Sequence, residues 1–197
     1  MRKLIANEWL TLDGVMQAPG YADEDPSGGF RHGGWHLQYF DDLARQWVVE
    51  GYAAAGGFVF GRRTYELLAS YWPNAPQEEE AVAGPLNTLP KYVASRTVSE
   101  PLEWSGSSLL GDDIPKAVAA LKQEDGKDIH VVGSSELMHT LIEHDLVDEF
   151  RLMIDPVVVG GGKHLFHDDG VLRSLWLIEG QLTTTGAIIA TYATSKA

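Results

Sequence analysis

The chain has 197 residues, of which 44% are hydrophobic and 22% are charged, a composition typical of a soluble globular protein. It contains no cysteine, which excludes disulfides, thiolate nucleophiles and cysteine-bound zinc or iron–sulfur centres. Its formal net charge of -13 argues against nucleic acid and membrane partners, because nucleic acid and anionic lipid both require a basic surface.

The N-terminal segment shows no targeting signal. Residues 1–6 lack the long apolar run and the small-residue cleavage site of a signal peptide. No apolar stretch of the sequence is long enough to span a bilayer. We therefore expect a cytoplasmic location.

The first half of the chain alternates predicted strands and helices. Hydrophobic periodicity and the Gly and Pro punctuation define these segments. Residues 71–90 hold four prolines and the acidic run Glu78–Glu80, so we expect a solvated loop there. In chain order we expect a strand at 4–12, a Gly- and Pro-rich loop, a helix at about 35–55, a strand at 58–60 and a helix beginning at 62.

The second half ends in strands without helices between them. We expect strands at 91–95, 107–110 and 129–132, helices after Asp113 and after Ser134 or Ser135, and final strands at 149–159, 174–182 and 187–193. Strands that alternate with helices and are followed by a strand-rich end predict an α/β fold. We expect a mostly parallel central sheet with antiparallel C-terminal strands, in a single domain over 1–197.

Two predicted strand-to-helix junctions carry residues suited to phosphate. In open α/β sheets, ligands bind outside the carboxyl ends of the strands, where helix N-termini offer unpaired N–H groups. The first junction combines Gly61, Arg62, Arg63 and Thr64, in which two guanidinium groups and a hydroxyl surround a close turn. A tight turn with two solvated arginines explains the same residues equally well.

The second junction is Gly133-Ser134-Ser135-Glu136, whose small residues and hydroxyls suit either a phosphate or an ordinary helix cap. Ser95 and Arg96 follow a third predicted strand and add another potential phosphate contact. Three anion-compatible strand ends in one acidic chain favour an anionic ligand over three separate structural explanations.

Other motifs are absent or incomplete. The sequence has neither the Rossmann Gly-x-Gly-x-x-Gly nor the P-loop motif, and its Gly-Ser-Ser segments lack the final glycine of a hydrolase elbow. The pairs His32/His36 and His164/His167 offer no recognised three-ligand spacing, so we expect no metal site. Gly160–Gly162 is interpreted as a turn at the end of the sheet. Trp9, Trp35 and Trp72 lie near predicted loop mouths and could stack on a flat heterocycle, although core packing is the more common role for each.

The ordered set of motifs resembles the dihydrofolate reductase-like superfamily. Its members share residues such as Leu4-Ile5-Ala6, Gly61–Tyr65, Ser95 and Gly133 in this order. The segments Thr11–Gly14, Leu146–Glu149 and Asp155–Gly162 more closely resemble the reductase domain of riboflavin biosynthesis, the C-terminal domain of the bifunctional deaminase-reductase. The resemblance covers nearly the whole chain and implies a three-layer dihydrofolate reductase-like fold.

The resemblance also implies NADPH as the cofactor. It places Arg62 and Arg63 at the adenosine 2′-phosphate and the pyrophosphate, Thr64 at the pyrophosphate, and Ser95 and Arg96 near the 2′-phosphate and adenine. The second phosphate turn would comprise Gly133, Ser134, Ser135 and Glu136, and Ala6 would also border the cofactor. Dihydrofolate reductases carry two glycines where this chain has Gly133-Ser134.

On the substrate side the resemblance implies an NADPH-dependent reductase of a pterin-like or ribosylaminopyrimidine-like heterocycle. One such activity is that of a 5-amino-6-(5-phosphoribosylamino)uracil reductase. Asp13, beside the expected nicotinamide site, is the candidate for orienting the substrate or its proton, although an Asp-Gly pair after a strand is also an ordinary turn. Asp41, Asp42 and Glu50 match no motif and are interpreted as solvated charges.

The antiparallel end of the sheet predicts a homodimer, because its edge can pair or pack across a two-fold axis. The alternative to an enzyme is a non-catalytic nucleotide-binding or assembly protein that retains the fold. NADPH binding distinguishes the enzyme from a protein that has lost the cofactor.

Overall fold

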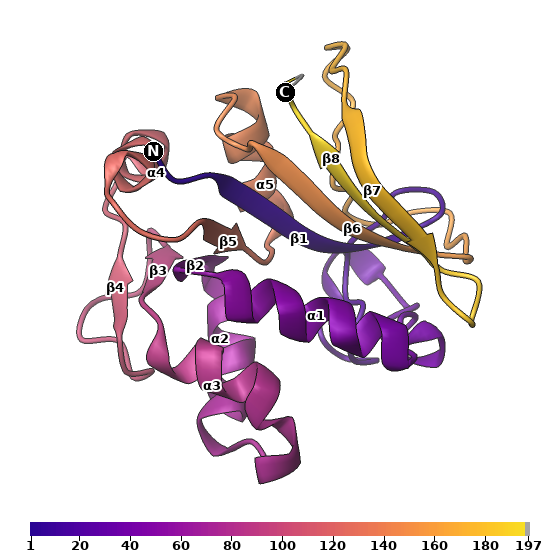
Figure 1. Cartoon of the computed structure of the whole chain (residues 1–197), viewed down its shortest axis with the longest axis horizontal. Helices are drawn as coiled ribbons and strands as arrows, with labels where there is room; N and C mark the ends of the chain where they lie inside the picture. Colours follow the sequence, from indigo (N-terminus) through magenta and orange to yellow (C-terminus); the bar gives the residue numbers. More distant parts are fainter. Residues whose placement is uncertain (196–197) are drawn as a thin grey trace. The chain divides into compact units, whose positions relative to one another are not determined.

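The computed structural model describes residues 1–195. The chain divides into two compact units, each built from separate segments (Figure 1). Unit 1 comprises Met1–Ala6 and Trp47–Val147, and unit 2 comprises Asn7–Gln46 and the chain from Asp148 onward. Strand β1 (Leu4–Thr11) and helix α1 (Asp42–Ala54) contribute residues to both units.

Unit 1 contains the parallel part of the sheet. Its strands follow the order β4-β3-β2-β5-β1, and all four neighbouring pairs are parallel. The strands are short and mostly buried, as expected for a parallel sheet covered on both faces. Their bounds are β2 Gly57–Gly61, β3 Lys91–Ala94, β4 Ser107–Leu109 and β5 Ile129–Val131.

Helices lie on both faces of the unit 1 strands. Figure 1 shows α2 and α3 on one side and α4 and α5 on the other, which gives this unit three layers. The buried core includes a run of aromatic rings in which Phe60 stacks on both Phe58 and Trp104. The helices are α2 Arg62–Tyr71, α3 Glu80–Thr88, α4 Ile114–Gln123 and α5 Ser135–Glu143.

The loop predicted over residues 71–90 is wrong. The segment instead forms the short 3-10 helices η3 (Trp72–Asn74) and η4 (Gln77–Glu79) followed by α3. Pro85 lies inside α3, but Val82, Ala83 and Leu86 are buried on its inner face. Burial of these side chains therefore outweighs the local preference of the prolines for a loop.

Unit 2 contains the antiparallel strands. Its strand order is β1-β6-β8-β7, and β8 pairs antiparallel with both β6 and β7. Every residue of β7 is exposed, whereas β6 and β8 each contain both buried and partly exposed positions. The bounds are β6 Glu149–Asp155, β7 Trp176–Leu182 and β8 Ile188–Ala193, and the long loop after β1 holds the 3-10 helices η1 (Ser27–Gly29) and η2 (Leu37–Tyr39).

The helix predicted from residue 35 begins later, at Asp42. The side chain of Asp41 accepts a hydrogen bond from the Ala44 amide, which is the geometry of a helix N-cap. The same carboxylate accepts two further bonds from the amide and hydroxyl of Thr184. Asp41 is therefore a structural residue that sets the start of α1.

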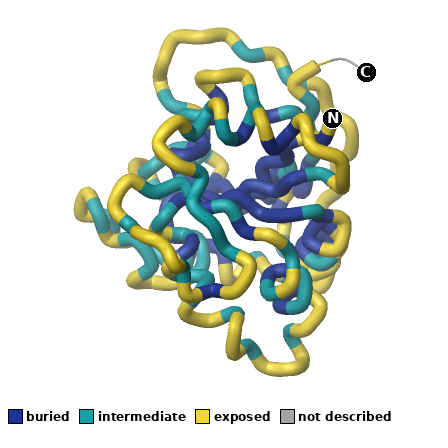
Figure 2. Tube along the Cα trace, turned by 90° about the vertical axis from the view of Figure 1, so that its left-hand side faces the viewer, coloured by how far each residue is buried: buried dark blue, intermediate teal, exposed yellow. Residues whose placement is uncertain are grey.

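The predicted fold class is confirmed. The chain has an eight-stranded mixed sheet that is parallel over most of its strands and antiparallel at its C-terminal strands. Figure 2 shows the buried residues gathered in the strands and the exposed residues in the connecting segments. No helix among residues 1–195 is long and apolar enough to cross a membrane.

Candidate functional site

Two of the predicted phosphate junctions touch each other in unit 1. Strands β2 and β5 are parallel neighbours, so the turns into α2 and α5 leave the same edge of the sheet. The Gly61 amide donates a hydrogen bond to the Gly133 carbonyl over 3.2 Å. A Cβ atom on Gly61 would lie 3.0 Å from Ser134 Cβ, and one on Gly133 would lie 2.7 Å from Thr64 Oγ1. The two glycines therefore allow the two helix starts to approach closely.

The N-termini of α2 and α5 have no side-chain caps. Gly61 and Ser134 occupy the N-cap positions. Gly61 has no side chain, and the Ser134 side chain makes no cap hydrogen bond. Helix α4, in contrast, is capped by Asp113, whose carboxylate accepts the Lys116 amide. The first amides of α2 and α5 and their helix dipoles therefore offer an adjacent pair of anion-binding ends.

Arg62 and Thr64 lie at this double junction. Arg62 forms an ion pair with Glu66 one turn along α2, at 2.9 Å, and both side chains are well exposed. Exposed pairs of this kind contribute at most about 1 kcal/mol, so Arg62 can exchange Glu66 for a phosphate at little cost. Arg63 is exposed in the same first turn, and Thr64 Oγ1 faces Gly133.

The third predicted contact follows β3, which is the other neighbour of β2. Gly61 and Ala94 are register partners, so Ser95 and Arg96 emerge beside the β2–α2 turn. Ser95 Oγ accepts hydrogen bonds from the Thr97 and Val98 amides, which fixes the turn and leaves its hydroxyl proton available. Arg96 is exposed.

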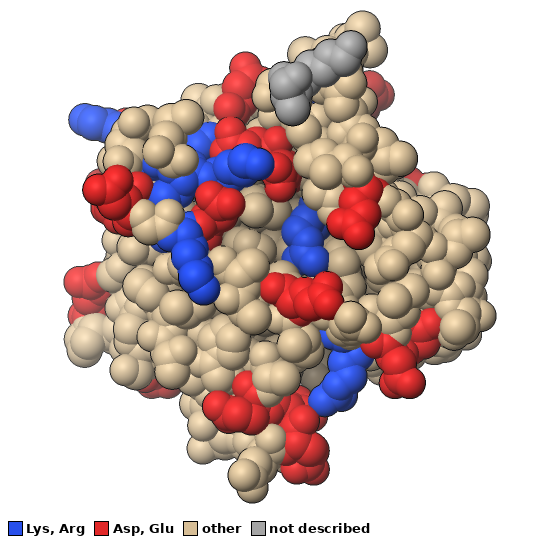
Figure 3. Space-filling model, in the orientation of Figure 1, with Lys and Arg blue, Asp and Glu red and all other residues tan. Residues whose placement is uncertain are grey.

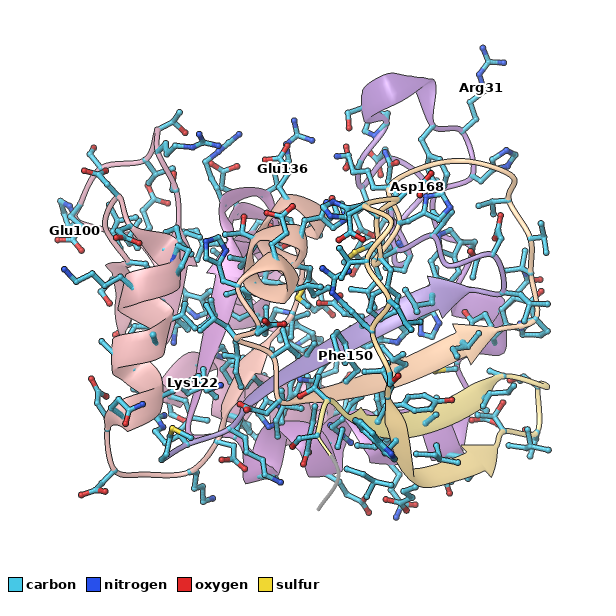
Figure 4. All side chains as sticks on the ribbon, turned by 90° about the horizontal axis from the view of Figure 1, so that it is seen from above. Arg31, Glu100, Lys122, Glu136, Phe150 and Asp168 are labelled. Carbon is cyan, nitrogen blue, oxygen red and sulfur yellow. The ribbon has the colours of Figure 1, made fainter. Side chains whose placement is uncertain are left out.

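The remaining predicted cofactor residues have unequal environments. Ala6 is fully buried in β1, in register with Val131 of β5. Ser135 is buried in the first turn of α5, whereas Glu136 is exposed and projects from that helix (Figure 4). A carboxylate in that turn would accept hydrogen bonds from sugar hydroxyls and would repel phosphate.

Asp13 lies in unit 2, where its carboxylate holds a turn together. It accepts hydrogen bonds from Thr11 Oγ1 at 2.6 Å, the Gly160 amide at 2.8 Å and the Val159 amide at 3.3 Å. The Thr11 hydroxyl and these amides lower the pKa of Asp13. Asp13 therefore remains ionised near neutral pH, and its catalytic role stays a prediction.

Unit 2 also contains an open cleft of about 530 Å³. Its walls are residues 27–32 and 159–163, together with Gln17. Arg31 and Lys163 bring positive charge to it, and Lys163 pairs with Asp25. The Arg31 side chain extends into solvent (Figure 4). The glycine-rich segment predicted to be a turn therefore forms one wall of a cleft that could receive an anionic group.

A buried histidine–aspartate pair lies elsewhere in unit 2. His36 Nδ1 is 2.8 Å from Asp155 Oδ2, and both side chains are almost fully buried. Burial raises the pKa of Asp155, and its hydrogen bond with His36 opposes that shift. Among residues 1–195 no cluster of three or more His, Cys, Asp or Glu side chains could hold a metal ion, so the pair is not part of such a cluster.

The family model for the RibD C-terminal domain matches residues 2–190, nearly the whole chain. This chain belongs to the RibD C-terminal domain family. The family is of the riboflavin-pathway reductase type, as the resemblance predicted.

Two curated relatives from Bacillus subtilis (strain 168) match over most of their length. The uncharacterized protein YyaP is 31% identical over 197 residues, which is 97% of this chain and 94% of YyaP. The uncharacterized protein YwjB is 27% identical over 167 residues, which is 85% of this chain and 84% of YwjB.

Solved structures with the same fold include two proteins with low sequence identity. A candidate riboflavin biosynthesis protein from Shewanella sp. PV-4 superposes with a TM-score of 0.68 at 19% identity, covering 98% of this chain and 99% of that one. A pyrimidine reductase-like protein from Corynebacterium diphtheriae gives 0.66 at 13% identity, covering 100% and 93%. These likenesses confirm the fold of this RibD C-terminal domain.

Sequence reasoning anticipated one part of this family member's site and missed another. The structure brings together Gly61, Thr64, Gly133 and Ser134, and places Ser95 on the strand beside them. Asp13 belongs to the other unit, unit 2. The pair His36–Asp155 was missed, because the two residues are 119 positions apart and no sequence pattern connects them.

Proposed function

We propose that this RibD C-terminal domain protein is an NADPH-dependent reductase of a small, flat heterocycle. The substrate would be pterin-like or ribosylaminopyrimidine-like, with 5-amino-6-(5-phosphoribosylamino)uracil as the specific candidate. The observation that carries the proposal is the pair of uncapped helix N-termini in contact at Gly61 and Gly133, with Arg62 and Arg63 in the first turn of α2.

The residues present fit NADPH in two respects. The close approach at Gly61 and Gly133 leaves main-chain amides where a pyrophosphate could be held. Arg62, Arg63 and Arg96 supply guanidinium groups for a 2′-phosphate in a chain that is otherwise strongly acidic. When bound, the reduced nicotinamide would supply the hydride, and the protein would position it and exclude water.

We also propose that the protein acts on its substrate as a homodimer. The support is β7, an edge strand whose exposed side chains include Trp176, Leu177, Ile178 and Leu182. Figure 3 shows few charged side chains on the part of this face where Figure 1 places β7 and β8. An apolar sheet edge of this kind favours a second copy as its partner.

The cofactor proposal is tested by titrating the protein with NADPH and following nucleotide fluorescence and binding calorimetry. We expect saturable binding that weakens at least about 10-fold in the double variant Arg62→Ala/Arg63→Ala, because the loss of even one charge-assisted hydrogen bond costs about 1.5–3 kcal/mol. NADH should bind more weakly than NADPH to the wild type, and this preference for NADPH should be smaller in the double variant. Arg173→Ala is the matched control, because Arg173 also pairs with a carboxylate four residues away.

Each result of this titration has a defined meaning. Absence of NADPH binding at about 1 mM, where even a weak complex of that Kd would be half formed, would contradict the proposal. Tight NADPH binding without oxidation in the presence of pterins and aminopyrimidines would favour the alternative, a non-catalytic nucleotide-binding or assembly protein with the same fold.

A further inference from the structure

The His36–Asp155 pair of unit 2 has two buried polar atoms without a hydrogen-bond partner. His36 Nε2 and Asp155 Oδ1 find no partner among residues 1–195. The residues are only 6% and 0% exposed. A buried polar atom left unpaired costs about 1–3 kcal/mol, so each such atom needs an explanation, and a catalytic or ligand-binding role is one.

The imidazole of His36 lies among three aromatic rings. Its centroid is 5.3 Å from that of Phe40, 5.8 Å from Trp9 and 6.2 Å from Trp35, all edge-on. Trp35 is anchored, because its indole N–H donates to the Gln17 carbonyl over 2.8 Å. The sequence indicates Trp9 and Trp35 as candidates to stack on a heterocycle, and in the structure both rings lie next to the His36 imidazole.

Two apolar side chains close to His36 in the chain reach the molecular surface. Phe40 is 39% exposed and Leu37 is 58% exposed, and both belong to the single turn of η2 or its end. Trp9 is also partly exposed. A flat ligand that displaces Phe40 or Leu37 would meet aromatic faces and one hydrogen-bonding nitrogen.

The position of the proton on His36 follows from its partner. An ionised carboxylate can only accept hydrogen bonds, so Nδ1 carries a proton and donates it to Asp155 Oδ2. Nε2 is then the ring atom that remains available to a ligand. Glu24 is the second carboxylate that acts on His36, and it accepts the Gly20 and Tyr21 amides.

We propose that His36, held by Asp155, is the substrate-binding proton donor of this protein, and that it receives a flat conjugated heterocycle through a ring nitrogen or carbonyl oxygen. This inference rests on the proposed reductase function for its chemistry. Asp155 is a positioning residue, because it acts through His36. The arrangement matches the logic of catalytic histidines, in which a carboxylate orients one nitrogen and the other nitrogen exchanges the proton.

The proton balance of the reduction is complete with this assignment. As a hydride adds to the carbon of a substrate C=N or C=O bond, the electron pair of that bond moves to the heteroatom. The proton on His36 Nε2 forms the new N–H or O–H bond, and the imidazole becomes neutral. NADPH, if bound, would supply the hydride and be oxidised to NADP⁺, and His36 would regain a proton from water. Asp13 is unsuited to this step, because its pKa is lowered.

The test uses lumazine, a flat pteridinedione with carbonyl and ring-nitrogen acceptors, as the probe on the full chain without cofactor. We expect lumazine to quench tryptophan fluorescence saturably at submillimolar concentration. His36→Phe should weaken binding about 10-fold or more while it preserves the aromatic packing, because it removes one charge-assisted hydrogen bond. His144→Phe is the control, because His144 is a second histidine paired through Nδ1, to the Thr140 carbonyl in unit 1.

The variant Asp155→Asn and a labelled spectrum separate a ligand-binding histidine from a structural pair. Asp155→Asn should weaken lumazine binding, because the carboxylate that orients the His36 ring is gone. The ¹⁵N signal of His36 Nε2 in histidine-labelled wild type should shift on addition of lumazine, a readout that needs no variant.

Each combination of results has one meaning. Unchanged lumazine affinity in His36→Phe, or no binding and no Nε2 shift at about 5 mM lumazine, would overturn the inference. Lumazine binding through His36 in a protein that does not bind NADPH would overturn the reductase function and retain the site. NADPH binding without lumazine binding would overturn the His36 site and retain the reductase function.

Discussion

At the residue scale, the buried side chain of Lys91 connects the start of β3 to the end of α3. It is fully buried at the start of β3, and its Nζ donates to the Leu86 and Leu89 carbonyls over 2.8 and 2.9 Å. It also lies 4.9 Å from the centre of the Trp104 ring. Lys91 therefore satisfies carbonyls at the end of α3, which would otherwise lack partners in the core.

Burial lowers the pKa of Lys91 to about 8. In the unfolded chain the pKa of a lysine is about 10.4. Between about pH 8 and 10.4 the unfolded state therefore binds more protons than the folded state, and the free energy of unfolding rises with pH. We predict that wild type gains about 2 kcal/mol relative to Lys91→Met between about pH 7 and 9.5. Urea unfolding of both proteins, followed by tryptophan fluorescence, measures this difference. If the free energies of unfolding of wild type and Lys91→Met changed equally with pH, the pKa of Lys91 would not be lowered.

At the scale of elements, the contact between the α2 and α5 N-termini depends on the absence of side-chain atoms. Gly61 adopts an ordinary extended conformation, so its glycine is required by space rather than by its backbone angles. A Cβ there would lie 3.0 Å from Ser134 Cβ and 3.1 Å from the Ser134 amide nitrogen. The two helices could then approach only with a shift of the backbone.

We predict that Gly61→Ala lowers the free energy of unfolding by about 1–3 kcal/mol through overpacking, measured by urea unfolding. It should also weaken NADPH binding, because it separates the two helix N-termini. Gly61→Ala/Ser134→Gly should recover part of both losses, because it removes the Ser134 side chain from the contact. The control is Gly161→Ala, whose added Cβ would meet no atom within 4 Å and should leave stability unchanged. Equal stability of Gly61→Ala and wild type would rule out this packing account.

At the scale of the whole molecule, the notable surface feature is the exposed strand β7. Leu177 is 61% exposed and Leu182 is 72% exposed, on a strand whose only pairing partner within residues 1–195 is β8. Natural proteins usually protect such edges with charges, prolines or a partner, and in β7 the only charged residue is Glu179. A second copy would cover both the edge and its apolar side chains.

We predict that light scattering coupled to gel filtration gives twice the chain mass of 21.6 kDa for the wild type. Leu177→Glu/Leu182→Glu should give the monomer mass with secondary structure retained, because buried carboxylates would oppose association. Leu172→Glu is the control, since Leu172 is exposed but lies outside β7. A monomeric wild type would exclude the homodimer.

The sequence determined the fold class and the convergence of the predicted phosphate junctions in unit 1. Alternation of strands and helices predicts the parallel strands of unit 1, because a right-handed strand–helix–strand connection has few alternatives. Phosphate junctions are predictable because carboxyl ends of parallel strands meet at one edge, so Gly61, Ser95 and Gly133 converge without any long-range information. Boundaries were less predictable at α1 and α3, where the Asp41–Thr184 hydrogen bonds and the burial of Leu86 decide the outcome.

Only the tertiary structure decided the pairing of His36 with Asp155, the buried position of Lys91 and the exposure of β7. Each depends on residues far apart in the chain or on which face of a strand is covered, and a local pattern of residue types holds neither kind of information. A histidine in a glycine-rich loop and an aspartate before a proline are ordinary separately. Their proximity, and the burial that leaves Nε2 without a partner among the described residues, exist only once the long loop has packed against the end of β6.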